Sequence, residues 1–317
     1  MEGFAAADHP SAGAVLRPPH CAHGATPRGE DANVDFIRSA ARRRTLGALA
    51  GTALIAAVIQ IPASAGTATA PDKHSARSGA PSAFSAAEDD DYYKDADGKT
   101  GEELKKALHG IISKNVKTLS YDDVWDALKE TDKDPDKAGN VILLYSGKSE
   151  SADNSGGGAD QWNREHVWAK SHGDFGTSQG PGTDVHHLRP ANVKVNSIRN
   201  NKDFDEGGEE VEGAPGNRTD EDSFEPRDEV KGDVARMILY MDVRYEGDDE
   251  FPDLEANDQV DNGSKPNIGK LSVLKKWSEE DPPDKFEKNR NQVIFDKFQH
   301  NRNPFIDHPE WVADIYK

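Results

Sequence analysis

The segment Asn163-Arg164-Glu165-His166-Val167-Trp168 is the stretch around which the rest of the chain is organised. It is followed by Asp184-Val185-His186-His187-Leu188-Arg189-Pro190 and then by residues 192–201, which read Asn-Val-Lys-Val-Asn-Ser-Ile-Arg-Asn-Asn. Together these segments supply carboxylates, three histidines, several amides and several cationic side chains. Such groups can hold a divalent metal and activate water beside a phosphate. The stretch therefore predicts a nuclease site.

The chemistry assigns a role to three of these residues. Cleaving a phosphodiester requires a nucleophile, neutralisation of charge on the phosphate and stabilisation of the leaving oxygen. Mg²⁺ prefers oxygen ligands and keeps most of its waters, so one carboxylate and one amide oxygen suffice, and Glu165 and Asn196 fit that demand. His166 is then free to act as general base, because an imidazole titrates near neutrality. We expect a divalent metal, with Mg²⁺ first and Mn²⁺ or Ca²⁺ as alternatives.

The local structure places one demand on this assignment. Asn192 is positioned to cap a helix that carries Asn196 and Arg199 on one face. Glu165 and His166, however, are adjacent, and in a regular strand adjacent side chains point to opposite faces. They can share a site only at the end of a strand or in an irregular loop.

These segments resemble the secreted endonuclease I family of ββα-metal, or His-Me finger, nucleases. Residues 141–147, 231–236 and 301–307 also resemble the extracellular bacterial branch of that family, so the resemblance runs roughly from Tyr92 to the C-terminus. It implies an α+β fold, a mixed, helix-rich single domain with an embedded ββα-metal finger. It also implies that His166 is the general base, that Glu165 and Asn196 bind the metal, and that DNA, RNA or both are cleaved to 5′-phosphate ends.

The phosphate-binding arginine is where the sequence departs from this pattern. In relatives that arginine lies between the two halves of the motif, but residues 173–182 contain no arginine here. The candidates are Arg199, Arg189 and Arg164, in falling order of preference. Arg199 fits a structural salt bridge equally well. Three further residues are expected to orient and brace the site without taking part in the chemistry: Asp184, His186 and His187.

The overall charge constrains how a polyanion can be bound. The chain has a net charge of -19 at pH 7, whereas nucleic-acid-binding surfaces are usually basic. A nuclease therefore requires local positive charge, and six cations lie close to the motif in sequence: Arg164, Lys170, Arg189, Lys194, Arg199 and Lys202. No base-reading element is evident, so we expect DNA and/or RNA to be contacted chiefly through phosphates, without sequence specificity.

The N-terminal residues predict export. Arg42-Arg43-Arg44 precedes an apolar run over residues 46–61 and then Ala63-Ser64-Ala65, the pattern of a signal peptide cleaved before Gly66. The run is too short, and too rich in Ala and Gly, for a comfortable membrane span, although an uncleaved anchor is the alternative. The residues before Arg42 are unusual for a signal, so we expect a wrongly assigned start, with Val34 as the candidate initiator.

The resulting organisation has three parts. Residues 1–65 are the signal peptide with its N-terminal extension, residues 66–90 a disordered linker rich in small residues, and residues 91–317 the nuclease domain. The single cysteine, Cys21, precedes the cleavage site, so the mature protein has no disulfide and no thiolate zinc site. We expect a secreted, extracellular monomer with no membrane partner after cleavage.

Hydrophobic periodicity predicts the main elements of the domain. Helices are expected after Thr100 and Ser120, across residues 230–245 with one face on the core, and across residues 271–277 and 286–298. A short buried strand is expected at residues 141–145. The alternating Asp132, Asp134 and Asp136 do not make a complete calcium loop, since Lys137 and Leu143 replace its Gly and Glu, so we predict a solvated connection.

Two other functions remain open. In a zinc hydrolase, His166, His186 and His187 would bind Zn²⁺ and Glu165 would be the base. Substituting His166 separates the two enzymes, because the loss of a zinc ligand abolishes metal binding whereas the loss of a base does not. The second alternative is a non-catalytic binder of extracellular polyanions, which the negative net charge disfavours.

Overall fold

The computed structural model describes residues 84–317, so the predicted signal peptide and residues 66–83 of the predicted linker lie outside the described residues. Helix α1 (Ala86–Tyr92) begins inside the stretch predicted as linker. Ser85 caps it, because its hydroxyl accepts from the Glu88 backbone N–H while the Glu88 carboxylate accepts from the Ser85 N–H. The folded domain therefore includes residues before position 91, where the small-residue composition had indicated a linker.

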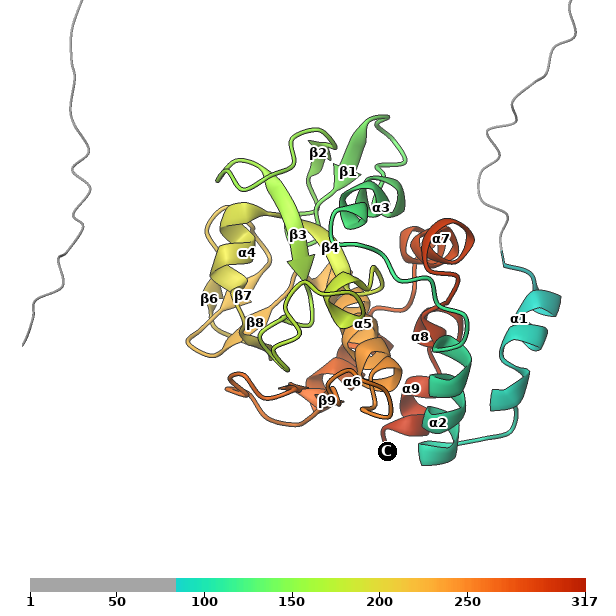
Figure 1. Cartoon of the computed structure of the whole chain (residues 1–317). Coiled ribbons are helices and arrows are strands. Elements are labelled where there is room, and N and C mark those ends of the chain that lie inside the picture. The colour runs from blue at the N-terminus through green and yellow to red at the C-terminus, as the bar shows by residue number, and fades with distance from the viewer. Residues whose placement is uncertain (1–83) are drawn as a thin grey trace, which may run out of the picture. The chain divides into compact units, whose positions relative to one another are not determined.

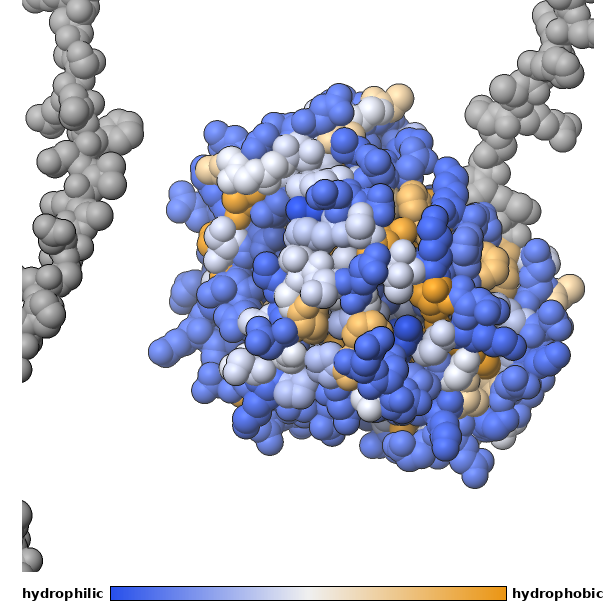
Figure 2. Space-filling model, viewed as in Figure 1, coloured by the Kyte–Doolittle hydropathy of each residue, from blue (hydrophilic) through white to orange (hydrophobic). Residues whose placement is uncertain are grey.

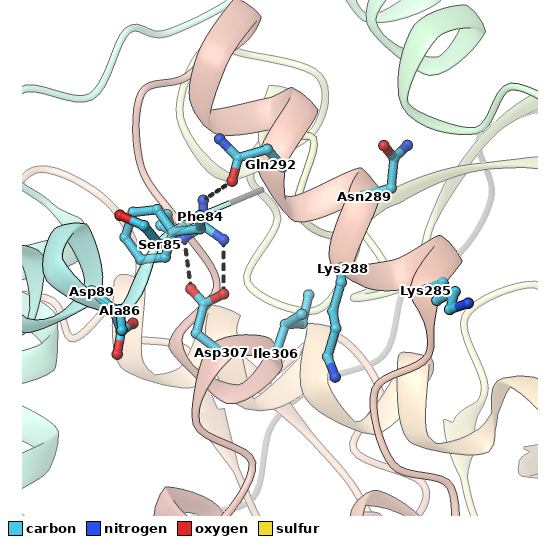
Figure 3. A pocket seen from close by; sticks show the side chains of 11 residues that line it. Phe84, Ser85, Ala86, Asp89, Lys285, Lys288, Asn289, Gln292, Ile306 and Asp307 are labelled. Carbon is cyan, nitrogen blue, oxygen red and sulfur yellow. Dashed lines mark hydrogen bonds and ion pairs between the residues drawn. The ribbon is translucent and has the colours of Figure 1, made fainter. Parts of the chain in front are cut away.

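Contacts with the C-terminal region explain why this segment is ordered. The ring of Phe84 covers the guanidinium of Arg302 at 3.7 Å, in a groove between α1 and α7 (Lys285–Val293) (Figure 3). Arg302 in turn donates to both carboxylate oxygens of Asp307, at 2.7 and 2.8 Å, and to the side chain of Gln292 at 2.9 Å. Arg302 is therefore held between an aromatic ring and a carboxylate, an arrangement that stabilises a cation. These contacts connect the start of α1 with residues near the C-terminus.

Helices dominate the described part, and their bounds agree with the predicted periodicity. Besides α1 and α7 they are α2 (Gly101–Ile112), α3 (Asp123–Thr131), α4 (Val193–Arg199), α5 (Lys231–Arg244), α6 (Leu271–Glu280), α8 (Pro304–Asp307) and α9 (Trp311–Ile315). Short 3-10 turns lie at η1 (Lys94–Ala96), η2 (Pro181–Thr183) and η3 (Asp228–Val230), and a π-helical turn, η4 (Ile294–Phe298), continues α7. None of the described helices is both long and apolar enough to cross a membrane.

The strands are short and form four small sheets. They are β1 (Asn140–Ile142), β2 (Ser149–Ser151), β3 (Trp162–His166), β4 (Leu188–Asn192), β5 (Asp203–Phe204), β6 (Glu209–Glu210), β7 (Arg218–Thr219), β8 (Ser223–Glu225), β9 (Glu255–Ala256) and β10 (Asn267–Ile268). The pairs β1–β2 and β3–β4 are antiparallel, β9–β10 is parallel, and the remaining four strands follow the order β5-β8-β7-β6. Helices and small sheets together confirm the mixed α+β class.

Helix α5 runs through the middle of the fold (Figure 1). The sequence predicted one buried face, but every residue from Gly232 to Arg244 is buried. The reason is that its charged side chains find partners on other elements: Arg236 pairs with Glu287 at 2.6 Å, and Asp242 with Lys105 at 3.0 Å. Apolar spacing reveals only the hydrophobic face of such a helix, so the prediction of a single packed face was wrong.

Asp132 also departs from its prediction. The loop that follows α3 was expected to be solvated, yet Asp132 is fully buried. Its carboxylate accepts from Arg189 at 2.5 Å and from Arg290 at 3.3 Å, and Arg189 also pairs with Asp233 at 3.2 Å. Since a buried carboxylate is tolerated only when it is paired, these ion pairs explain its position. The pairs tie α3, β4, α5 and α7 together in a chain without disulfides among its described residues.

The β3–β4 hairpin and α4 form one continuous unit. Glu165 lies opposite Arg189 and His166 opposite Leu188, and α4 starts directly after β4. The Asn192 side chain accepts from the Lys194 N–H at 3.0 Å, so it caps α4 as predicted. A hydrophobic cluster packs against the hairpin. Its members include Trp162, Leu188, Val124, Leu128, Val141 and Ile294. The expected ribbon and helix are therefore present.

Candidate active site

Glu165 and His166 are the last two residues of β3. This is the strand-end position that adjacent residues need in order to share a site. Both line a cavity of about 510 Å³ together with Asn163, Arg164 and Asn196. Its rim is completed by Tyr121, Ala169, Lys170, Ser171, Ser197, Asn200 and Asn201. The predicted base and both predicted metal ligands thus converge on one cavity.

The protein holds the Glu165 carboxylate through contacts to one of its two oxygens. Tyr145 donates its hydroxyl to Oε1 at 2.7 Å, and the Arg199 guanidinium lies 3.5 Å from the same oxygen. Burial raises the pKa of this carboxyl to about 6, although Arg199 and the Tyr145 hydrogen bond oppose the shift. Its other oxygen, Oε2, has no hydrogen-bond partner among the described residues. One oxygen is held by the protein and the other is available to a ligand.

The His166 ring is held in one tautomer. Its Nε2 lies 3.1 Å from the carbonyl oxygen of Gly182, so Nε2 carries the hydrogen and Nδ1 is the acceptor. Burial lowers the pKa of His166 well below its usual value, and the neighbouring His187 adds to this effect. The ring is therefore neutral at neutral pH and able to accept a proton at Nδ1.

Asn196 is placed by the second turn of α4. Its amide Nδ2 donates to Asn163 Oδ1 at 2.8 Å, which leaves its Oδ1 without a protein partner in the described part of the chain. This amide oxygen and Glu165 Oε2 are therefore two hard oxygen donors that line the same cavity. Such a pair is the donor set that a cation such as Mg²⁺ prefers, with its remaining ligands supplied by water and phosphate.

Asp184, His186 and His187, which were predicted to brace the site, are buried in the protein interior. The Asp184 carboxylate accepts from Tyr240 at 2.9 Å, from Tyr245 at 3.0 Å and from Gln299 at 3.0 Å. His187 Nε2 lies 2.7 Å from the Pro181 carbonyl oxygen, and the His187 and His166 rings are 5.6 Å apart. His186 Nε2 lies 3.2 Å from Asn301. Burial lowers the pKa of both histidines to about 4.

The three arginine candidates occupy different positions. Arg199 is fully buried and donates to the backbone carbonyl oxygens of His166 and Val167 at 3.0 and 2.6 Å. Arg189 is 1% exposed and is used in the ion pairs with Asp132 and Asp233. Only Arg164 lines the cavity. The cavity lining therefore favours Arg164, the last of the three in the expected order.

The local positive charge is weaker than the sequence indicated. Of the six clustered cations, only Arg164 and Lys170 line the cavity. Lys202 donates to Thr219 and to the Asp220 carbonyl oxygen, and Lys194 forms an exposed ion pair with Asp160 at 3.6 Å. The face of the molecule in Figure 2 is largely hydrophilic, with apolar residues scattered over it. A nucleic acid would therefore meet only a small basic area here.

Sequence reasoning missed three aromatic residues of the site. Tyr145, which orients Glu165, appeared only as part of a buried strand, but β1 ends at Ile142 and Tyr145 lies in the turn that follows. Tyr121 and Trp125 lie at the start of α3 and contact Arg164. Nothing in their local sequence distinguishes them from core residues, because their roles depend on contacts with β3.

Comparison with known proteins extends these observations. The family model described as Endonuclease I matches residues 100–310, which contain every site residue named above. An extracellular ribonuclease of Bacillus subtilis (strain 168) is 63% identical over 230 residues, which cover 73% of this chain and 80% of that protein. An extracellular ribonuclease of Bacillus amyloliquefaciens is 63% identical over 230 residues, which cover 73% of this chain and 79% of that protein.

Proposed function

The chain belongs to the endonuclease I family, and from this premise we propose that it is a secreted, metal-dependent endonuclease. It hydrolyses phosphodiester bonds of RNA and DNA without sequence specificity and leaves 5′-phosphate ends. The observation that carries the proposal is that one cavity is lined by three residues with acceptor atoms that have no partner among the described residues. These atoms are Glu165 Oε2, Asn196 Oδ1 and His166 Nδ1.

Four residues of the cavity have distinct roles in this reaction. Glu165 and Asn196 would hold the divalent cation, which when bound neutralises the phosphate and stabilises the leaving oxygen. His166 takes a proton from water at Nδ1, while the Gly182 carbonyl oxygen keeps the opposite nitrogen protonated. Arg164 offers its N–H groups to the phosphate.

The supporting residues fix the positions of these groups. Tyr145 and Arg199 hold one Glu165 oxygen, so the carboxylate cannot rotate away from the cavity. Arg199 also binds the backbone carbonyl oxygens at the end of β3, so it supports the strand that carries both Glu165 and His166. Pre-positioned groups of this kind lower the reorganisation that the reaction requires.

The substrate follows from the nucleophile and from the relatives. Both Bacillus proteins are extracellular ribonucleases by name, which supports RNA as a substrate of this chain. Water, and not the 2′-hydroxyl, is the nucleophile in the proposed mechanism, so DNA is chemically open as well. Among Mg²⁺, Mn²⁺ and Ca²⁺, Mg²⁺ is the first candidate, because the site offers few protein oxygen ligands and Mg²⁺ keeps most of its waters.

The geometry does not favour the zinc hydrolase. His186 and His187 each use Nε2 on a neighbouring main-chain or amide oxygen. Within residues 84–317, no group of three His, Cys, Asp or Glu side chains is arranged to hold a metal. A pure polyanion binder is disfavoured as well, because only two cations line the cavity.

The direct experiment uses the purified mature chain with supercoiled plasmid and structured RNA, in Mg²⁺ and in EDTA, beside His166→Ala. We expect metal-dependent cleavage that is lost in the variant. His300 is an exposed histidine that does not line the cavity, so it supplies the matched control His300→Ala, which should cleave normally. Failure of the parent protein to cleave either polymer with Mg²⁺, Mn²⁺ or Ca²⁺ would overturn the proposal.

A further inference from the structure

The guanidinium of Arg164 packs against two aromatic rings. Its Cζ atom lies 3.4 Å from the centroid of the Tyr121 ring and 4.1 Å from that of the Trp125 ring. Trp125 in turn packs edge-on against the buried Trp162, with ring centroids 5.2 Å apart. We call Tyr121 and Trp125 the aromatic clamp. Both are partly buried, as is Arg164.

Local structure fixes the clamp in place. Trp125 lies in the first turn of α3, and Tyr121 lies in the turn that precedes this helix. Ser120 and Asp123 hold this start, because the Asp123 carboxylate accepts from the Ser120 N–H at 3.0 Å and the Ser120 hydroxyl accepts from the Asp123 N–H at 3.2 Å. The two rings are therefore held at the start of α3, Trp125 by the helix and Tyr121 by the hydrogen-bonded turn before it.

The clamp restricts how Arg164 can bind a ligand. One of its terminal nitrogens, Nη1, donates to the Tyr121 carbonyl oxygen at 2.5 Å. No hydrogen bond from Nε or Nη2 to the described residues is formed. Because two rings pack against the guanidinium, its free in-plane N–H groups are the part left for a ligand, and a planar fork is suited to two oxygens of one phosphate.

The clamp also links Arg164 to the base. Arg164 and His166 are two residues apart on β3 and so project to the same face of the strand. The Tyr121 ring contacts the guanidinium and lies nearly parallel to the His166 ring, with a centroid distance of 5.9 Å and an interplanar angle of 27°. It thus sets the separation between the group that would hold the phosphate and the group that would activate water.

From this geometry we propose that Tyr121 and Trp125 are positioning residues that fix Arg164 as the phosphate-contacting arginine of this chain. The proposal rests on the nuclease function proposed above. The clamp supplies what residues 173–182 lack, since they contain no arginine. Trp125 packs on Arg164, whereas Tyr121 also stacks on the His166 ring, so it is the effect of Trp125 on cleavage that must disappear when Arg164 is absent.

A double-mutant cycle tests this dependence. Tyr121→Leu and Trp125→Leu remove one ring each, whereas Tyr121→Phe keeps the ring and removes only the hydroxyl. Because a misplacement of about 1 Å can cost about a hundredfold in rate, we expect the two Leu variants to lose about 10- to 100-fold in kcat/KM. Tyr121→Phe should restore most of it. Arg164→Lys should behave like Arg164→Met, because an ammonium lacks the planar fork that stacks on the rings and binds two phosphate oxygens.

The decisive comparison is made in the Arg164→Met background. There, adding Trp125→Leu should change kcat/KM no further, while thermal unfolding confirms that each variant is folded. If the losses multiply in that background, or if Tyr121→Leu cleaves as well as the parent, the clamp does not act through Arg164 and the proposal is overturned. Absence of cleavage by the parent protein would instead refute the nuclease function itself.

Discussion

Replacing Arg189 should cost stability and spare the chemistry. The side chain is 1% exposed, and its Nε lies 2.5 Å from Asp132 Oδ1 while Nη1 lies 3.2 Å from Asp233 Oδ2. In Arg189→Met both carboxylates lose a partner, although Arg290 still pairs with Asp132 at 3.3 Å. Breaking a buried ion pair costs about 3–5 kcal/mol, and the remaining pair places the expected loss near the lower end, at about 3 kcal/mol.

Thermal and urea unfolding, followed by circular dichroism and tryptophan fluorescence, measure this loss. For a domain of this size, about 3 kcal/mol corresponds to a fall of roughly 6–12 °C in Tm. The matched control is Arg218→Met, the same chemical change at an exposed residue of β7, which should stay within about 0.5 kcal/mol. A stable Arg189→Met variant that no longer cleaves nucleic acid would refute the reasoning, because it would place Arg189 on the phosphate.

Three further predictions test other parts of the site. Tyr145→Phe removes the hydrogen bond to Glu165, so Mn²⁺ affinity should fall about 10- to 100-fold while the fold is kept; unchanged affinity would contradict this. The folded-state pKa of His186, about 4, lies below its usual 6.5, so this one residue should account for a loss of about 2 kcal/mol of stability from pH 7 to pH 5, and His186→Gln should reduce the total loss by that amount. Because only Arg164 and Lys170 line the cavity, log affinity for DNA should fall with log salt at a slope no steeper than about -2; a slope near about -6 would reveal a second basic surface.

The parts of the site that the sequence predicted are contiguous in the chain. Glu165 and His166 end one strand, Asn192 caps the helix that follows the next, and Asn196 lies one turn into that helix. Local geometry alone brings these residues together, so spacing and capping rules were sufficient. The hairpin and helix therefore followed from a single short region of sequence.

The parts that the sequence missed depend on distant contacts. Tyr145 reaches Glu165 across 20 positions, and the Tyr121 carbonyl oxygen reaches Arg164 across 43. Arg236 pairs with Glu287 across 51 positions, which allows a helix with several charges to be buried on all sides. Distant contacts also explain why the sequence could not rank the arginine candidates. An arginine near the motif in sequence can equally well pair with a buried carboxylate outside the cavity.

Metal binding by the parent protein and by His166→Ala, followed as Mn²⁺ affinity by electron paramagnetic resonance, tests the central assignment most directly. Glu165→Gln and Asn196→Ala serve as the variants that should weaken binding. We predict that His166→Ala binds Mn²⁺ as the parent does while cleaving neither RNA nor DNA, since a base is lost and both oxygen ligands remain. Loss of Mn²⁺ binding in His166→Ala would make this histidine a metal ligand and contradict the account.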